Sequence, residues 1–270
     1  MGHNHLHRIA PGATVDLTTL SAADTAAAPG DKAATRAATE PLVARLAELQ
    51  EMLWARRRET VLVVLQGIDT SGKGGTVEHV FGAVNPAGLR VTSFKAPTEP
   101  ELARDYLWRV HAHVPSDGEI GVFDRSHYED VLAVRVLDLV PEGQWRKRYG
   151  HINAFEALLA DEGTTIVKLF LHLSKDEQKA RLQSRLDRPE KHWKFQRSDL
   201  DSRARWDEWE AAFSEMLSRT STAHAPWYVI PADSKWYRNW AVATIMVDVL
   251  EEMNLTWPKS TEDLTGVVVD

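Results

Sequence analysis

Residues 65–80, which read LQGIDTSGKGGTVEHV, contain a near match to a phosphate-binding loop. Gly67, Gly72 and Lys73 fill the pattern G-x-x-x-x-G-K, but Gly74 stands where such loops carry a hydroxyl that binds Mg²⁺. Glycines let phosphate oxygens approach backbone N–H groups, and lysine places a positive charge beside a phosphoryl group. The motif predicts phosphoryl chemistry, and the alternative is a glycine-rich turn with a surface lysine. The other predicted contacts in the loop are Thr70, Ser71, Gly75 and Thr76.

Two carboxylates are candidates for metal binding. Asp69 lies inside the loop, and Asp124 ends an apolar run in the stretch EIGVFDRSHYEDV. Two carboxylates that face one phosphate chain bind one or two Mg²⁺ ions, so Asp69 is a candidate replacement for the missing hydroxyl. The alternatives are that Asp69 only stabilises the turn and that Asp124 caps the next helix. Ser126 can take the capping role instead, which leaves Asp124 and Arg125 free to act on phosphate.

The segment 175–197 is basic within an acidic protein. It carries eight Lys or Arg and four Asp or Glu, a difference of +4, whereas the whole chain has a net charge of −7. In kinases of small phosphorylated substrates such a segment closes as a lid over the transferring phosphoryl group. The alternative is a solvated helix face. Cations elsewhere extend the basic track and indicate a polyanion longer than a nucleotide; they are Lys95, Arg104, Arg109, Arg146, Lys147 and Arg148.

Apolar runs alternate with helical patterns along most of the chain, which predicts an α/β fold with a mainly parallel sheet. Strands are predicted at 60–67, 91–97, 119–124, 164–173 and 226–231. Helices are predicted from about Pro41, and then at 75–84, 99–112, 127–139, 144–161, 175–187, 199–219 and 234–253. In the last of these an apolar stripe that begins at Trp236 predicts core packing. The predicted division is a flexible arm at 1–38, one domain at 39–255 with a lid at about 181–197, and a tail at 256–270.

Composition excludes several classes of function. The 270 residues include no cysteine, which rules out disulfides and thiolate-bound metals, and the pI near 5.9 disfavours a general nucleic-acid binder. No run of about 18 apolar residues predicts a membrane span, and the N-terminus lacks an apolar signal core. A cytoplasmic location is expected. His3, His5 and His7 could chelate a metal, but a polar tail is the favoured interpretation.

Five stretches in order resemble the family-2 polyphosphate kinases. They are GIDTSGKGGT, VNPAGLRVTSFKAPTEPEL, DYLWRVH, FDRSHYEDV and RLDRPEKHWKF, within about residues 60–197. The resemblance implies a thymidylate-kinase-like P-loop fold, with a five-stranded parallel sheet, flanking helices and a helical lid. It also implies phosphoryl transfer between inorganic polyphosphate and nucleotides, with Mg²⁺ as cofactor and Mn²⁺ as an alternative. The stretch VNPAG…FKAP is most similar to the subgroup that accepts nucleoside mono- and diphosphates, namely AMP, ADP, GMP and GDP.

The resemblance also implies roles for individual residues. Asp69 and Asp124 match the magnesium-binding, catalytic carboxylates, and Lys73 and Arg125 match the phosphate ligands at the transfer centre. The further phosphate or nucleotide contacts that it implies are Lys95, Arg109, Glu129 and, in the lid, Arg185, Lys191, Trp193 and Lys194. His127 departs from the family pattern, in which many members carry Trp. Relatives are oligomeric, so a homodimer or homotetramer is expected.

Two other functions fit the same motifs. An ATP-dependent kinase of the thymidylate or shikimate type shares the loop and the Asp-Arg strand end, but needs less basic surface. A non-catalytic polyanion-binding module needs the basic surface but neither carboxylate. Transfer of phosphoryl groups from polyphosphate accounts for the loop, the carboxylates and the basic segment together.

Overall fold

A five-stranded parallel sheet forms the centre of the protein, as predicted. The computed structural model describes residues 6–269. The strands are β1 (Thr60–Gln66), β2 (Leu89–Ser93), β3 (Ile120–Asp124), β4 (Thr164–His172) and β5 (Trp227–Pro231), in the order β2-β3-β1-β4-β5. β1 is buried along its whole length, which explains why it reads as a continuous apolar run. Because all strands are parallel, the loops at their carboxyl ends lie on one edge of the sheet.

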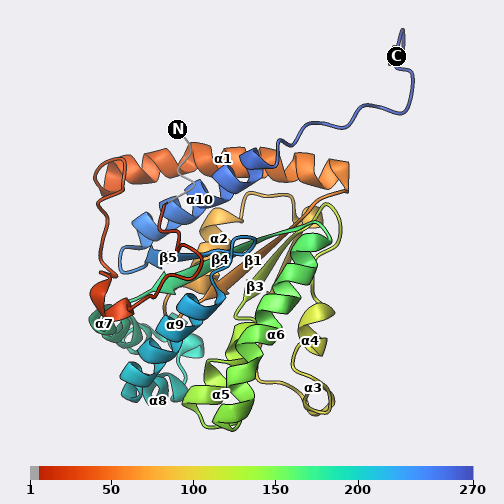
Figure 1. Ribbon diagram of the computed structural model, residues 1–270. Coiled ribbons are helices and arrows are strands. Elements are labelled where there is room, and N and C mark those ends of the chain that lie inside the picture. The colour runs from red at the N-terminus through yellow and green to blue at the C-terminus, as the bar shows by residue number, and fades with distance from the viewer. Residues whose placement is uncertain (1–5, 270) are drawn as a thin grey trace.

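Helices cover both faces of the sheet (Figure 1). One face packs against α1, α2 and α10, and the other against α5, α6 and α9. The helices are α1 (Lys32–Arg56), α2 (Lys73–Val80), α3 (Glu99–Leu102), α4 (Trp108–His111), α5 (Ala133–Val136), α6 (Glu142–Asp161), α7 (Lys175–Leu186), α8 (Ser198–Ala204), α9 (Trp206–Thr220) and α10 (Lys235–Glu252). Short 3₁₀ turns are η1 (Leu17–Thr19), η2 (Pro86–Gly88), η3 (His127–Asp130) and η4 (Pro189–Lys194). None of the helices in the described residues is long and apolar enough to cross a membrane.

Three predicted helices are each split in two by the fold. The prediction at 99–112 becomes α3 and α4, because the Asp105 carboxylate accepts hydrogen bonds from the N–H groups of Leu107 and Trp108 and starts a new turn. The prediction at 127–139 becomes η3 and α5, and that at 199–219 becomes α8 and α9. Propensity and periodicity do not show such breaks, because side-chain caps and tertiary contacts decide them.

The prediction that the first helix begins near Pro41 is wrong. α1 begins at Lys32, where the Asp31 carboxylate accepts hydrogen bonds from the N–H groups of Ala33 and Ala34. Pro41 lies inside the helix. α1 packs along α10, and this contact stabilises the helix through a region of weak sequence signal (Figure 1).

Residues 6–31, here called the N-terminal segment, pack against the domain, contrary to the flexible arm predicted from composition. Ile9 and Val229 donate backbone hydrogen bonds to Trp227 and His7, so the segment pairs with the outer edge of β5. Leu17 is buried at 2% exposure. The His7 side chain bonds to the Tyr237 hydroxyl, whereas the possible metal ligands His3 and His5 lie outside the described residues.

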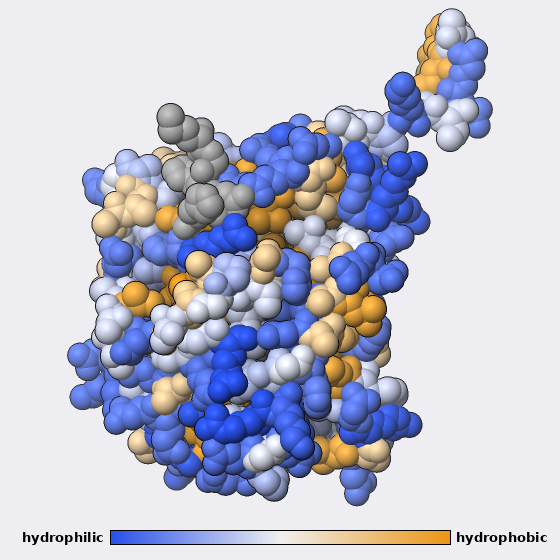
Figure 2. All heavy atoms as spheres, in the orientation of Figure 1, coloured by the Kyte–Doolittle hydropathy of each residue, from blue (hydrophilic) through white to orange (hydrophobic). Residues whose placement is uncertain are grey.

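The chain after α10 contrasts with the N-terminal segment. The residues that follow Leu255 are exposed and extend away from the body of the molecule (Figures 1 and 2). Val268 is 80% exposed and Val269 is 92% exposed. The two ends of the chain, both predicted to lie outside the domain, therefore differ in how they pack.

Candidate active site

The phosphate loop connects β1 to α2 at the carboxyl edge of the sheet, and two of its glycines are required by space as well as by backbone angle. Gly67 has a φ of 147°, and a Cβ there would lie 2.8 Å from the carbonyl oxygen of Leu171. Gly72 has a φ of 104°, and a Cβ there would meet the Arg238 guanidinium, so for Gly72 the backbone angle is the stronger requirement. The first-turn N–H groups of α2, which begins at Lys73, have no partner within the helix and form an anion site with the helix dipole.

Lys73 is buried at the start of α2. Its Nζ donates a hydrogen bond of 2.8 Å to the Gly67 carbonyl across the loop, and its side chain lines the cleft above the loop. Two other residues at the cleft hold positive φ angles without being glycine: Thr70 at 73° and Arg125 at 62°. Such angles cost on the order of 1–3 kcal/mol each and persist where the surrounding structure holds them, often at functional sites.

Asp69 and Arg125 form an ion pair between the loop and the residue that follows β3. Their side chains remain 28% and 40% exposed, so both still face the cleft. Burial acts to raise the pKa of the Asp69 carboxyl, but Lys73 and Arg125 outweigh it and hold that pKa below its ordinary value. Asp69 is therefore ionised at neutral pH and available to a cation.

Asp124 ends β3 directly opposite Leu65 of β1 and also lines the cleft. The described residues contain no group of three or more His, Asp or Glu side chains that would hold a metal by themselves. Two carboxylates suit Mg²⁺ better than most metals, because Mg²⁺ keeps several waters and binds through one or two carboxylates plus substrate phosphates. Asp69 and Asp124 fit that donor set.

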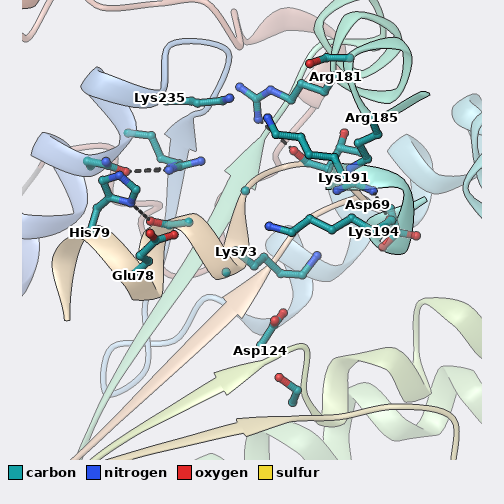
Figure 3. Close-up of a pocket in the computed structure, with 18 of the residues that line it drawn as sticks. Asp69, Lys73, Glu78, His79, Asp124, Arg181, Arg185, Lys191, Lys194 and Lys235 are labelled. Carbon is teal, nitrogen blue, oxygen red and sulfur yellow. Dashed lines mark hydrogen bonds between the residues drawn. The ribbon is translucent and has the colours of Figure 1, made fainter. Parts of the chain in front are cut away.

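A cleft of about 1950 Å³ opens over the loop. Most of the predicted site residues line it: Asp69, Thr70, Gly72, Lys73, Gly74, Gly75, Lys95, Asp124, Arg125, Arg185, Lys191, Trp193 and Lys194. Figure 3 shows labelled cations from α7, η4 and α10 facing one another across the space above Lys73 and Asp124. The sequence motifs therefore converge on one cavity.

Residues of the basic segment 175–197 line one side of the cleft, and whether they close as a lid stays a prediction. Arg185 on α7 donates hydrogen bonds to the Lys194 carbonyl at 2.9 Å and to the Asp199 carboxylate at 3.2 Å, which fastens the η4 turn over the cleft. Trp193 is 76% exposed, with the Lys194 ammonium 4.8 Å from its ring centroid. An exposed aromatic ring beside cations offers a surface to a nucleotide base as well as to phosphate.

Five predicted residues do not line the cleft. Gly67, Ser71 and Thr76 lie beneath the loop, where the Thr76 hydroxyl bonds to the Gly72 carbonyl. Arg109 is 7% exposed and donates to the Lys95 carbonyl at 2.9 Å. Glu129 accepts a hydrogen bond from Gln66, and burial raises the pKa of its carboxyl although Arg125 opposes this. These residues support the site from behind rather than contacting the space above the loop.

His127, where the family pattern carries Trp, is fully buried. Its Nε2 lies 3.2 Å from a carboxylate oxygen of Glu156 on α6, and it is not part of the cleft lining. Its side chain therefore belongs to the interior beneath the Asp-Arg strand end.

Sequence reasoning missed the wall of the cleft that α1 and α10 supply. Arg36 and Glu40 from α1, and Lys235, Trp236 and Arg238 from α10, line it. Trp236 was predicted to be a core residue; it packs against the core and also faces the cleft. One signal was available: Lys235 and Arg238 stand in the first turn of a helix, where the helix dipole disfavours cations unless an anion is bound nearby.

The missed cations raise the positive potential of the site. Burial and the neighbouring Arg181 lower the pKa of Arg238 to about 10. Burial, Arg181, Lys191 and Arg238 lower the pKa of Lys235. Cations that depress one another's pKa values repel in the free protein, and a bound polyanion relieves that repulsion.

Comparisons with known proteins agree with this geometry. Residues 30–258 match the family model described as polyphosphate kinase 2 (PPK2). An AMP/ADP-polyphosphate phosphotransferase from Meiothermus ruber is 52% identical over 264 residues, which cover 98% of this chain and 99% of the relative. An ADP-polyphosphate phosphotransferase from Rhodopseudomonas palustris is 43% identical over 231 residues, which cover 81% of this chain and 80% of the relative.

A solved structure gives the same result for the fold. The crystal structure of polyphosphate kinase 2 from Arthrobacter aurescens TC1 superimposes with a TM-score of 0.93 at 46% identity, over 96% of this chain and 92% of that one. The sequence identity, the coverage and the shared fold lead to one conclusion. This chain belongs to the polyphosphate kinase 2 family.

Proposed function

We propose that this protein is a Mg²⁺-dependent phosphotransferase that moves phosphoryl groups between inorganic polyphosphate and nucleotides. One observation supports it above others: the phosphate loop opens into a cleft whose cations come from five separate helical elements, α1, α2, α7, η4 and α10. A nucleoside triphosphate donor needs a loop and a few cations, whereas a chain of phosphates is matched by a wide basic cavity. The names of the relatives from Meiothermus ruber and Rhodopseudomonas palustris point to the same reaction.

We assign the residues of the cleft to a direct, in-line transfer of one phosphoryl group. An oxygen of the nucleotide's terminal phosphate forms a bond to the end phosphorus of polyphosphate, while the bond from that phosphorus to the next bridging oxygen breaks. Lys73 and Arg125 are placed to neutralise charge on the moving group, and the α2 N–H groups bind its oxygens. Asp69 and Asp124 would hold Mg²⁺, or Mn²⁺ in its place, and the ion supplies further neutralisation of phosphate charge.

We assign the acceptor role to nucleoside mono- and diphosphates, AMP and ADP first and GMP and GDP as further acceptors. The first part follows the printed name of the Meiothermus ruber relative. The exposed Trp193 ring supports a base contact through stacking, which is tolerant of base identity because every base has an aromatic face.

The decisive experiment incubates the protein with Mg²⁺ and polyphosphate, and with AMP and ADP in separate reactions. ADP and ATP should form and should be absent without enzyme or without Mg²⁺. No product above the no-enzyme control would refute the proposal. Product only when ATP replaces polyphosphate would identify an ATP-dependent kinase, and polyphosphate binding without any turnover would identify a binding module.

We also propose a cytoplasmic homodimer or homotetramer that does not bind nucleic acid or membranes. Exposed leucines support self-association; they include Leu137, Leu139 and Leu158, of which Leu139 is 64% exposed. Light scattering after gel filtration should give a mass of two or four chains. Single-stranded DNA at the same phosphate concentration should not inhibit turnover.

A further inference from the structure

Arg181 on α7 uses every N–H group of its guanidinium. Nε donates to the Glu177 carboxylate at 2.8 Å, and Nη1 donates to the carbonyls of Thr70 and Ser71 at 2.9 and 3.2 Å. Nη2 donates to the carbonyls of Ala232 and Asp233 at 2.6 and 2.9 Å. An arginine has five N–H donors in a rigid, planar arrangement, and here all five have acceptors on three different parts of the chain.

The first of these parts is the phosphate loop. In a trans peptide the C=O and the next N–H point in opposite directions, so fixing the carbonyls of Thr70 and Ser71 also fixes the N–H groups of Ser71 and Gly72. Ser71 N–H then closes the turn on the Ile68 carbonyl at 3.0 Å. Thr70 holds its φ of 73° in this arrangement, a conformation that needs an outside restraint.

The other parts are the lid and the chain before α10. α7 continues from Arg181 to Arg185, which fastens the η4 turn over the cleft. Asp233 lies before α10, which carries the cleft cations Lys235 and Arg238, and its carboxylate accepts a hydrogen bond from the Ser174 N–H at the start of α7. The Arg181 side chain is 9% exposed, and Figure 3 shows it at the lid side of the cleft.

We propose that Arg181 is a positioning residue. It holds the phosphate loop in its binding conformation and links that loop to α7, the helix that leads into the η4 turn over the cleft. It acts through the loop rather than by replacing Lys73 or Arg125 as a phosphate ligand. The kinetic part of this inference rests on the proposed function, but the restraint on the loop does not.

The test compares Arg181→Lys and Arg181→Ala with the wild-type protein. Lysine keeps the charge but offers three donors from one nitrogen, so it cannot serve five acceptors in three directions. We expect kcat/KM for polyphosphate to fall at least tenfold in Arg181→Lys, and further in Arg181→Ala. Arg148→Lys is the matched control. The sequence counted Arg148 in the basic track, but its side chain is buried, donates to Asp130 and does not line the cleft.

Hydrogen exchange separates positioning from general stability and does not need turnover. In the wild-type protein, polyphosphate should protect the amides of residues 67–76 strongly. In Arg181→Lys these amides should exchange faster without ligand and gain less protection with it, while amides of the α6 and α9 cores stay unchanged. Millimolar guanidinium should restore part of the activity of Arg181→Ala but not of Arg148→Ala.

Two results would overturn the proposal. One is loop exchange and polyphosphate protection in both Arg181 variants within twofold of wild type. The other is a uniform increase of exchange across all cores that Arg148→Lys reproduces, which would make Arg181 a structural residue only. If the wild-type protein lacks transferase activity, the exchange data still decide the role of Arg181, so failure of the two proposals can be told apart.

Discussion

The cleft and the interior beneath it both contain several charged side chains, but they differ in how far the protein neutralises those charges. In the interior, the fully buried side chains of His127, Tyr128, Glu156 and Lys168 form what we call the buried polar cluster. Lys168 donates to the Glu156 carboxylate at 2.6 Å, the Tyr128 hydroxyl at 2.8 Å and the Thr220 carbonyl at 2.6 Å. Each of the three hydrogens of the ammonium has its own acceptor, and its charge has a partner.

Among the described residues of the cleft, Arg125, Arg181 and Arg185 have carboxylate partners, but five other cations do not. Within the part of the chain that the structure describes, no carboxylate lies within ion-pair distance of Lys73, Lys191, Lys194, Lys235 or Arg238. An interior charge must be neutralised by the protein, because water is absent and an unpaired buried charge is costly. A cation in an open cleft is hydrated in the free protein and can be neutralised later by a ligand. The interior cluster is therefore neutralised within the protein, whereas the five unpaired cleft cations leave positive charge open to a ligand.

The largest expected effect comes from removing a cleft charge at the transfer centre. Lys73→Met or Asp124→Asn should lower kcat by on the order of 10²-fold or more, because each removes electrostatic stabilisation of the transferring group. The thermal midpoint should change much less than the activity, because neither side chain forms an ion pair in the fold, although Lys73 donates to the Gly67 carbonyl and lowers the pKa of Asp69. Steady-state assays and thermal unfolding of the same preparations measure both. Lys259→Ala, in the exposed C-terminal tail, is the control, and near-native turnover in Lys73→Met would contradict the assignment.

In the buried polar cluster, a substitution should lower stability strongly and activity only slightly. Glu156→Gln leaves the Lys168 ammonium buried without its partner and should cost about 3–5 kcal/mol of unfolding free energy. Activity per folded molecule should stay within a few-fold of wild type, because the cluster does not line the cleft. Chemical denaturation and an active-site titration measure the two quantities. The double variant Lys168→Met/Glu156→Leu should be less destabilised than Glu156→Gln, and a loss of turnover with unchanged stability would reverse the comparison.

The contrast between the cleft and the buried polar cluster also explains which residues could be placed from the sequence alone. The loop, the Asp-Arg strand end and the basic segment lie in short contiguous motifs, so local spacing was enough to place Asp69, Lys73 and Asp124 in one cavity. Lys168 reads from sequence only as a polar residue in an apolar strand, because its partner Glu156 comes from α6 through tertiary packing. Arg238 is a similar case, since it reaches the loop only when α10 packs beside α2.

Arg109 shows what burial and hydrogen bonds add to a motif. The sequence predicts a cation near the polyanion, whereas the side chain lies 5.3 Å from the Phe94 ring centroid and bonds to the Lys95 carbonyl. It thereby positions Lys95, which does line the cleft. A motif identifies the neighbourhood of a residue, but burial and hydrogen bonds decide whether it contacts substrate or supports a residue that does.

Salt should weaken substrate binding in the cleft but hardly affect the buried polar cluster. This difference is expected to be smaller than the effects of the substitutions above. Raising KCl from 50 to 300 mM should increase KM for polyphosphate several-fold, because exposed cations are screened over distances of about 10 Å at 0.1 M salt. The thermal midpoint should shift by no more than about 2 °C, since buried pairs are screened far less. Lys235→Gln should reduce the slope of log KM against log salt. A KM that is independent of salt would show that the cleft cations do not bind the donor.

The smallest effect concerns two histidines that hold the N-terminal segment. His172 donates to the Leu20 carbonyl at 3.0 Å, and burial lowers its pKa below 6.5 although that carbonyl, Glu210 and Asp233 oppose this. Burial lowers the pKa of His7 in the same way, with Asp24 opposing. Below pH 6.5 the unfolded chain binds protons that the folded protein excludes, so this contribution to stability falls as the pH falls.

Asp130 acts in the opposite direction, because burial raises the pKa of its carboxyl to about 6 and the folded protein then binds the extra proton. As the pH falls, the histidines lower the thermal midpoint of the whole protein and Asp130 raises it. A variant is therefore needed to isolate the contribution of one histidine. His172→Gln keeps a donor for the Leu20 carbonyl but cannot titrate, so between pH 7.5 and 5.5 its midpoint should fall by roughly 2–4 °C less than that of wild type. His224→Gln, at an exposed position, should behave like wild type. Equal pH dependence in all three proteins would show that the N-terminal segment is not held by a neutral histidine.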